Sequence, residues 1–160
     1  MSEAADFRNV GSSSLGKELS LKECEVIAGV MQVTHLGDGE QLVGQSGSEN
    51  TLFLLVDGYL DVLSDMEGKL VTVYTMSKGE VAGTRAFVDR SPRKATLRAK
   101  GKATVYSMEP DEFEALLERH PQIVYKVMRG LFRITHSNLL RMNKETEQLA
   151  NYISKSGGRY

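Results

Sequence analysis

The chain has a single cysteine and no apolar run long enough to cross a membrane. With Cys24 alone, the sequence excludes an intrachain disulfide scaffold, a structural zinc site and an iron–sulfur cluster. No stretch approaches the roughly 18 consecutive apolar residues of a membrane helix. The acidic start MSEAADF also lacks the apolar core of a secretory signal. We therefore expect a cytoplasmic protein without a membrane partner.

The short motifs of common enzyme classes are also missing. There is no P-loop, no Gly-x-Ser-x-Gly elbow, no His-Glu-x-x-His pair and no dinucleotide fingerprint. The three histidines, His35, His120 and His136, are far apart in the sequence and lack the spacing of metal ligands. We expect the protein not to be an enzyme, with no catalytic residues, no metal site and no permanently bound cofactor.

The composition is that of a folded domain with an uneven distribution of charge. Of the 160 residues, 41% are hydrophobic and 26% are charged, which suits one globular domain rather than a disordered chain. Residues 1–80 carry 5 basic and 13 acidic side chains, whereas residues 81–160 carry 15 basic and 8 acidic ones. Such asymmetry indicates an anion site, a nucleic-acid surface or an ordinary solvated face. The densest cluster of cations contains one acid, Asp89, and comprises Arg85, Arg90, Arg93, Lys94, Arg98, Lys100 and Lys102.

The beginning of the chain predicts an arm followed by a helix. Residues 1–18 are polar and are expected to form a flexible N-terminal arm. Ser20 and Glu23 have the spacing of a capping box, which satisfies backbone N–H groups at the start of a helix. Apolar residues then recur at helical intervals, which predicts a helix from about residue 21 to residue 33.

From residue 40 to residue 108 the pattern changes to short β-prone runs separated by turns. Asp57-Gly58 lies between two apolar runs, which is the usual signal for a two-residue hairpin turn. Several short strands with such turns predict a mainly β fold with flanking helices, namely an antiparallel jelly-roll barrel. The expected strands are 40–43, 51–56, 59–63, 70–76, 95–99 and 103–108.

Two helices are expected after the β region. Pro110 suits the first position of a short helix, and Pro121 is expected to open a long helix that ends near Tyr152. The chain then divides into the arm, a domain over residues 19–152 and a tail over residues 153–160.

The long helix carries a broad apolar band that must be covered. A second copy of the same helix or the barrel itself can cover it, and we favour a homodimer through this helix. Because the chain ends a few residues later, we expect no DNA-binding domain on it and a separate protein as its downstream partner. The band comprises Val124, Val127, Met128, Leu131, Phe132, Leu139 and Met142.

The stretch 79–97 carries the features of an anion site. Gly79 and Gly83 allow the backbone to approach a ligand closely. Residues 86–88 can form a single helical turn whose first N–H groups point at an anion. Arg93 offers a planar guanidinium that suits phosphate oxygens. Backbone donors beside one arginine fit a single phosphate held in a concave site.

This stretch resembles the phosphate-binding cassette of the cyclic nucleotide-binding domain family. That cassette reads Gly, two residues, Phe-Gly-Glu, one residue and Ala, followed after a short gap by Pro-Arg-x-Ala-Thr. The resemblance covers about residues 19–150 and implies a stand-alone sensor module similar to the effector domain of catabolite activators. The matching cassette positions are Gly79, Gly83, Ala86, Pro92, Arg93, Ala95 and Thr96.

The resemblance implies a role for each site residue. Arg93 would pair with the phosphate of a ligand such as cyclic AMP or cyclic GMP, and the N–H groups of Gly83 and Ala86 would line that phosphate. Binding would shift the cassette and the long helix together, and the helix would pass the signal on. The base would be contacted by residues of a strand and of the long helix, namely Val71 or Val73, Asn138 and Leu139.

Three cassette residues depart from the family pattern. Thr84 stands where the family usually has a Glu that binds the ribose 2′-hydroxyl. A charge-assisted bond of this kind contributes about 1.5–3 kcal/mol, so its loss weakens a ribose site roughly tenfold to a hundredfold. Arg85 and Lys94 replace an apolar residue and a small one, and both add positive charge.

Three interpretations are compatible with the sequence. The site binds a cyclic nucleotide with altered affinity or a ligand richer in phosphate. Alternatively, it has lost ligand binding and the degenerate fold serves as a dimerisation or interaction protein. In a third interpretation, the basic cluster of residues 85–102 binds nucleic acid. This interpretation predicts that the affinity for a duplex falls steeply as the salt concentration rises.

Overall fold

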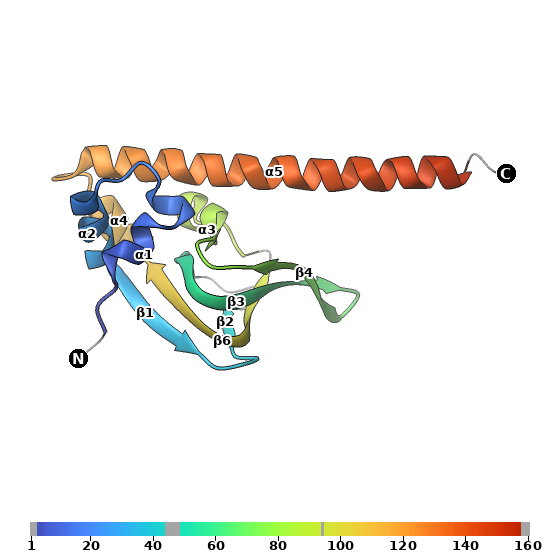
Figure 1. Ribbon diagram of the computed structural model, residues 1–160, viewed down its shortest axis with the longest axis horizontal. Coiled ribbons are helices and arrows are strands. Elements are labelled where there is room, and N and C mark those ends of the chain that lie inside the picture. Colours follow the sequence, from blue (N-terminus) through green and yellow to red (C-terminus); the bar gives the residue numbers. More distant parts are fainter. Residues whose placement is uncertain (1–2, 44–48, 94, 158–160) are drawn as a thin grey trace.

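A computed structural model describes residues 3–43, 49–93 and 95–157. Figure 1 shows a curved sheet, a group of short helices near one end of it, and one long helix that runs past the rest of the molecule. The elements in chain order are α1 (Phe7–Gly11), the 3-10 helix η1 (Ser14–Gly16), α2 (Leu21–Gly29), β1 (Met31–Leu36), β2 (Gln41–Val43), β3 (Leu52–Met66), β4 (Lys69–Met76), β5 (Val81–Ala82), α3 (Thr84–Asp89), β6 (Thr96–Met108), α4 (Pro110–Ala115) and α5 (Pro121–Gly157).

The sheet is antiparallel and has the order β1-β6-β3-β4. β6 pairs with β1, β2 and β3, and β3 pairs in addition with β4 and β5. The sheet curves like a jelly roll (Figure 1). Because β1 and β4, its two edge strands, do not pair with each other within the described ranges, the sheet does not close into a barrel. The predicted class, an antiparallel β fold with flanking helices and a long C-terminal helix, is confirmed.

The first half of β3 lies between two hydrophobic clusters. Leu52 and Leu54 pack with residues of the helices, whereas Phe53 and Leu55 pack inside the curved sheet. Successive side chains of a strand point to opposite faces, and here both faces are buried. This explains why the sequence Leu-Phe-Leu-Leu-Val shows no alternation of apolar and polar residues.

The N-terminal segment is ordered where a flexible arm was expected. α1 and η1 occupy most of residues 7–16, and Ser13 caps η1 by accepting a hydrogen bond from the N–H of Leu15. Val10 and Leu15 are buried in the cluster formed by the helices. The arm prediction is therefore wrong over these residues, because two apolar side chains in a polar segment provide enough burial to fix it.

α2 is confirmed at its start and is shorter than predicted at its end. Ser20 and Glu23 form the expected capping box. The helix ends at Gly29, and Met31 already pairs with Met108 as the first residue of β1. β1 is held by pairing with a strand about 70 residues later in the chain, which helical spacing in the local sequence does not reveal.

Asp57-Gly58 lies inside β3 and does not form a hairpin, so that prediction is wrong. The pairing of β3 with β6 shifts register on both sides of Asp57. Gly58 has φ +82°, and a Cβ atom there would lie 2.1 Å from the carbonyl oxygen of Lys102. Glycine is needed for close approach of the neighbouring strand. The tight turn between β3 and β4 is Glu67-Gly68, where both φ angles are positive, as a type I′ hairpin requires.

Replacing Gly58 with alanine is expected to lower the free energy of unfolding by more than about 2 kcal/mol, because the new Cβ adds a clash to a strained φ. Gly39→Ala is the matched control, since Gly39 also has a positive φ but no atom within 4 Å of its would-be Cβ. Urea denaturation of both variants measures the difference. Equal losses in the two variants would mean that the contact with Lys102 is unimportant.

α5 divides into a packed part and a projecting part. Pro110 and Pro121 open α4 and α5 as predicted. Val127 and Leu131 in the first part of α5 are buried against the domain, whereas Figure 1 shows the later part extending beyond it. α5 has 37 residues, which corresponds to a length of about 55 Å. Part of the predicted apolar band is therefore covered within the chain, and part is not.

Candidate functional site

The N-terminus of α3 presents main-chain donors that the helix itself does not satisfy. Gly83 caps this helix with φ +86° and ψ 17°, and the first hydrogen bond to the cap runs from the N–H of Phe87 to the oxygen of Gly83, at 2.9 Å. The N–H groups of Thr84, Arg85 and Ala86 precede that bond and have no acceptor within the helix. α3 has no acidic residue in its first turn, so the positive end of its dipole is not neutralised locally.

Arg93 lies behind this helix terminus with its guanidinium inside the protein. It is 8% exposed, its Nη2 donates to the oxygen of Thr51 at 2.8 Å, and its Cζ lies 5.0 Å from the centre of the Phe53 ring. Its Nε is buried and has no hydrogen-bond partner within the part of the chain that the structure describes. A Cβ atom on Gly83 would lie 2.8 Å from Nη1 of Arg93, so glycine is required at this contact.

The charge of Arg93 has no close counter-ion among residues 3–43, 49–93 and 95–157. Among the described residues, no carboxylate oxygen lies within the 4.0 Å of an ion pair with its guanidinium. Burial lowers the pKa of Arg93, against the more distant charges of Glu49 and Glu109. Because arginine stays protonated in proteins, the interior holds a cation that an anion would neutralise.

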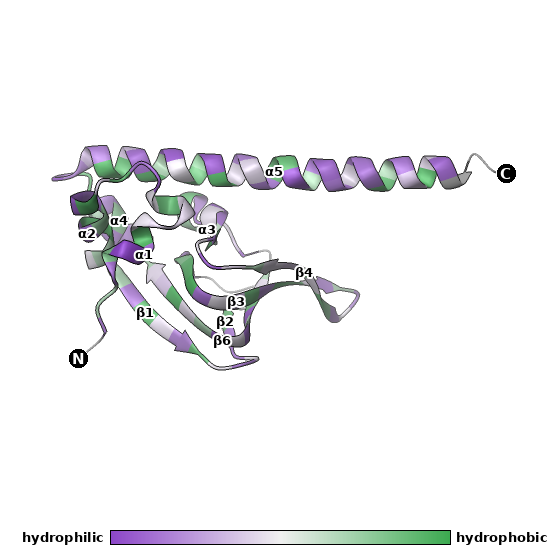
Figure 2. Ribbon diagram, viewed as in Figure 1, coloured by the Kyte–Doolittle hydropathy of each residue, from purple (hydrophilic) through white to green (hydrophobic). Residues whose placement is uncertain are grey.

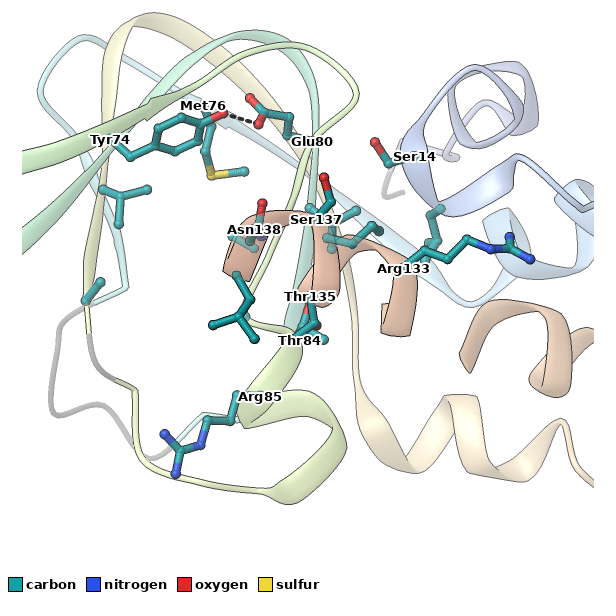
Figure 3. A pocket seen from close by; sticks show the side chains of 18 of the residues that line it. Ser14, Tyr74, Met76, Glu80, Thr84, Arg85, Arg133, Thr135, Ser137 and Asn138 are labelled. Atoms are coloured by element: carbon teal, nitrogen blue, oxygen red, sulfur yellow. Dashed lines mark hydrogen bonds between the residues drawn. The ribbon is translucent and has the colours of Figure 1, made fainter. Parts of the chain in front are cut away.

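A pocket of about 1040 Å³ lies beside Arg93 and α3. β4, β5, α3 and the segment before β6 form its walls together with α5, which crosses it. Figure 3 shows Tyr74 and Glu80 on one side, Arg85 on the opposite side and Asn138 of α5 between them.

The structure brings most of the predicted site residues together. Both the phosphate-binding and the base-contacting predictions have members in the wall of the pocket. Val71 is half-exposed on β4 and is not part of the wall, so its predicted contact with the ligand base is not supported. Lys94 lies outside the described residues. The predicted residues that line the pocket are Gly83, Thr84, Arg85, Ala86, Arg93, Val73, Asn138 and Leu139.

A polar network in the wall was not predicted from the sequence. Tyr74 donates a hydrogen bond from its hydroxyl to the carboxylate of Glu80, which raises the pKa of Tyr74. Glu80 also accepts from the N–H of Ser77 at 2.6 Å, and the guanidinium of Arg141 lies 4.1 Å from the centre of the Tyr74 ring. Glu80 directly follows Gly79, the first residue of the cassette, so its place in the sequence could have indicated that it lies near the site. The contact with Arg141 depends on where α5 lies, which no local pattern specifies.

The N-terminal segment connects the start of the cassette with α5. The N–H of Ser14 donates to the oxygen of Gly79 at 3.0 Å. Glu18 forms an ion pair with Arg133 of α5 at 3.0 Å, and Glu23 forms one with Lys126 at 2.7 Å. The segment that was expected to be a free arm therefore contacts both the cassette and the long helix. The family resemblance implies that these two parts shift together when a ligand binds.

The basic cluster of residues 85–102 is dispersed in space. Arg93 points inward, and Arg90 is paired with Asp111 at 2.7 Å and with Glu114 at 3.3 Å. Of the other described cations of the cluster, Arg85 lies on α3, whereas Arg98, Lys100 and Lys102 lie on β6. The described members are thus divided among the interior, an ion pair, a helix and a strand, which does not favour a single basic face for nucleic acid.

The described residues form neither a metal-binding group nor a membrane-spanning helix. Within residues 3–43, 49–93 and 95–157, no three His, Cys, Asp or Glu side chains form a group that could hold a metal ion. None of the described helices is long and apolar enough to span a membrane.

Comparison with known proteins identifies the family. The model of the cyclic nucleotide-binding domain matches residues 33–120, which is more than half of the chain. The chain belongs to the cyclic nucleotide-binding domain family, as the cassette indicated.

Three relatives illustrate the extent of the similarity. The cAMP-dependent protein kinase regulatory subunit of Mycosarcoma maydis is 27% identical over 123 residues, which cover 69% of this chain and 23% of that protein. The chain thus spans about a quarter of that relative. A cyclic nucleotide-binding domain from Methylobacillus flagellatus is 19% identical, with TM-score 0.81 and coverage of 87% of this chain and 81% of that one. The regulatory domain of Toxoplasma gondii PKA, crystallised with cAMP, is 17% identical, with TM-score 0.65 and coverage of 77% and 47%. These structural likenesses show the fold.

Proposed function

We propose that the pocket binds the phosphate of a cyclic nucleotide-type ligand at Arg93 and the N-terminus of α3. The observation that carries this proposal is the buried guanidinium of Arg93, which has no ion pair among the described residues and an unpartnered Nε. A buried charge is costly unless it is paired, so a site that had lost its ligand would not be expected to keep this arrangement. The relatives from Mycosarcoma maydis and Toxoplasma gondii, both described in terms of cAMP, support the ligand class.

The phosphate and the base of such a ligand have separate surroundings in this pocket. Phosphate oxygens accept hydrogen bonds from the guanidinium and from the first N–H groups of α3, whose dipole favours an anion. The other walls offer apolar contacts from Val73 and Leu139 and the amide of Asn138, which both donates and accepts. This combination suits a flat heterocyclic base with polar edges.

α5 is the proposed output of the module. The same helix forms a wall of the pocket, bonds to the N-terminal segment and projects beyond the domain. A ligand that binds one position of α5 better than another shifts the population toward that position. No catalytic step is assigned to the site, and the protein acts as a regulator rather than as an enzyme.

The projecting part of α5 is proposed to pair with α5 of a second copy. Nine residues at strictly alternating intervals of three and four form a seam beside the face that packs on the domain, and Figure 2 shows apolar bands continuing to the end of the helix. Seven of them are large, exposed apolar residues. Such a repeat over four heptads is typical of a coiled coil. The seam comprises Tyr125, Met128, Phe132, Thr135, Leu139, Met142, Thr146, Leu149 and Ile153.

Isothermal titration of the protein with cyclic AMP and cyclic GMP tests the proposed function. We expect measurable heat at or below about millimolar ligand. Thr84→Glu is expected to raise the affinity about tenfold, because a carboxylate at the first position of α3 can accept a hydrogen bond from a ribose hydroxyl. Thr84→Gln is the matched control, since it has the same shape without the charge. If neither the wild type nor Thr84→Glu binds a ligand, the proposed function is wrong, and the fold serves only in dimerisation or in interaction with another protein.

A further inference from the structure

The pocket holds more positive charge than one phosphodiester can neutralise. This point rests on the proposed function and concerns the ligand of the same site. Of the residues that the structure describes, six cationic ones and three carboxylates line the pocket. The cations are Lys17, Arg85, Arg93, Lys126, Arg133 and Arg141, and the carboxylates are Glu18, Glu80 and Glu145.

Half of these cations already have partners. Arg133 pairs with Glu18 at 3.0 Å, and Arg141 lies 3.9 Å from Glu145. Lys126 pairs with Glu23, which lies outside the wall of the pocket, at 2.7 Å.

The other three cations, Arg93, Arg85 and Lys17, have no carboxylate within ion-pair distance among the residues that the structure describes. The carboxylate of Glu80 accepts from Tyr74 and Ser77. It is the one remaining negative charge of the wall, so about two positive charges are in excess.

Two of the unpaired cations lie near the start of α3, since Arg93 contacts the N-cap residue Gly83 and Arg85 belongs to the first turn. Arg93 and the terminus of α3 form the inner position. Arg85 is exposed in the first turn of α3, on the side of the pocket opposite Glu80 (Figure 3). An anionic group near Arg85 is therefore attracted by the guanidinium and by the dipole of α3, and lies away from the unpaired carboxylate.

We propose that this site selects a nucleotide ligand that carries two phosphate groups over a cyclic mononucleotide, with the inner phosphate at Arg93 and the second at Arg85. A cyclic mononucleotide carries one negative charge and leaves about one cation of the pocket without a partner. The pocket volume of about 1040 Å³ is slightly above the usual range of about 300–1,000 Å³ for small-molecule sites, so volume alone does not restrict the ligand to one nucleotide unit. A cyclic dinucleotide has two phosphodiesters and a second nucleotide unit, so it meets both conditions. A linear nucleoside diphosphate also has two phosphate groups, but it carries about three negative charges and only one nucleotide unit.

Titration of one preparation with matched ligands tests this inference. The ligands are cyclic AMP, cyclic di-AMP and ADP, followed by the corresponding guanine set, all at one ionic strength because charged contacts are screened by salt. We expect the best two-phosphate ligand to bind at least tenfold tighter than the cyclic mononucleotide with the same base. Tighter binding of the dinucleotide identifies the cyclic form, and tighter binding of ADP or GDP identifies the linear one.

Arg85→Ala locates the second phosphate. It is expected to weaken the two-phosphate ligand at least fivefold more than the mononucleotide. Lys100→Ala is the matched control, since Lys100 is exposed outside the pocket and the variant also removes one positive charge.

The possible failures are distinguishable. Cyclic mononucleotides that bind as tightly as the two-phosphate ligands, or Arg85→Ala acting equally on both classes, would overturn this inference and leave the proposed function intact. Binding of none of the ligands would overturn both.

Discussion

Arg93→Met is expected to weaken binding of a phosphate ligand by about thirtyfold to a few thousandfold. Truncating one partner of a desolvated, hydrogen-bonded charge pair costs about 2–5 kcal/mol of binding free energy, which corresponds to that range. Methionine has a similar length and no charge, so the ligand loses its cationic partner while the space stays filled. Titration of both proteins with the same ligand measures the loss.

The stability of the same variant separates a binding residue from an ordinary core residue. Arg93→Met removes the hydrogen bond to Thr51 and the contact with Phe53, but it also removes a buried cation with an unpartnered Nε. These terms oppose one another, and we expect the free energy of unfolding to stay within about 1 kcal/mol of the wild type. A core truncation such as Leu54→Ala is expected to cost about 2–5 kcal/mol.

Arg119→Met is the control for this experiment, since Arg119 is exposed and lies outside the pocket. It is expected to change neither binding nor stability by a measurable amount. A fully retained affinity in Arg93→Met would contradict the assignment of the phosphate site. A collapse in stability would instead make Arg93 a structural residue.

Leu149→Glu is expected to convert the proposed dimer into monomers. Leu149 is a member of the α5 seam, is 59% exposed in the single chain and lies outside the pocket. In a coiled coil each copy of a seam residue is buried against the partner helix, so the substitution replaces two buried apolar side chains with carboxylates. We expect the dissociation constant of the dimer to rise at least a hundredfold, as measured by sedimentation velocity over a concentration series.

Leu140→Glu provides the matched comparison on the same helix. Leu140 is 55% exposed and is also outside the pocket, but it does not belong to the seam. This variant is expected to remain dimeric. If both variants dissociate equally, or if the wild type is already monomeric at concentrations of tens of micromolar, pairing along the seam is excluded.

The sequence predicted the parts of the structure that local chemistry determines. Ser20 and Glu23 identified the start of α2, and Pro110 and Pro121 identified the starts of the last two helices. The cassette was also recognisable, because Gly83 and Arg93 are only ten residues apart and the chemistry of a phosphate site restricts both.

The predictions that were incorrect, and the contacts that were not predicted, involve distant parts of the chain. Asp57-Gly58 has the local signature of a turn, but close packing against Lys102 requires the glycine inside a continuous strand. The extent of β1 depends on pairing with β6. The stacking of Arg141 on Tyr74 joins residues that are far apart in sequence. Periodicity within a short window carries no information about such contacts.

Leu139 and Met142 belong both to the wall of the pocket and to the seam of α5. Because these two side chains take part in both ligand binding and dimerisation, the two equilibria are coupled. If dimerisation changes the affinity for the ligand by some factor, ligand binding changes the affinity of the dimer by the same factor. If α5 pairs with a second copy, the ligand concentration at which half of the sites are filled depends on how much of the protein is present. The abundance of the protein would then set its sensitivity, with no change in any residue that touches the ligand.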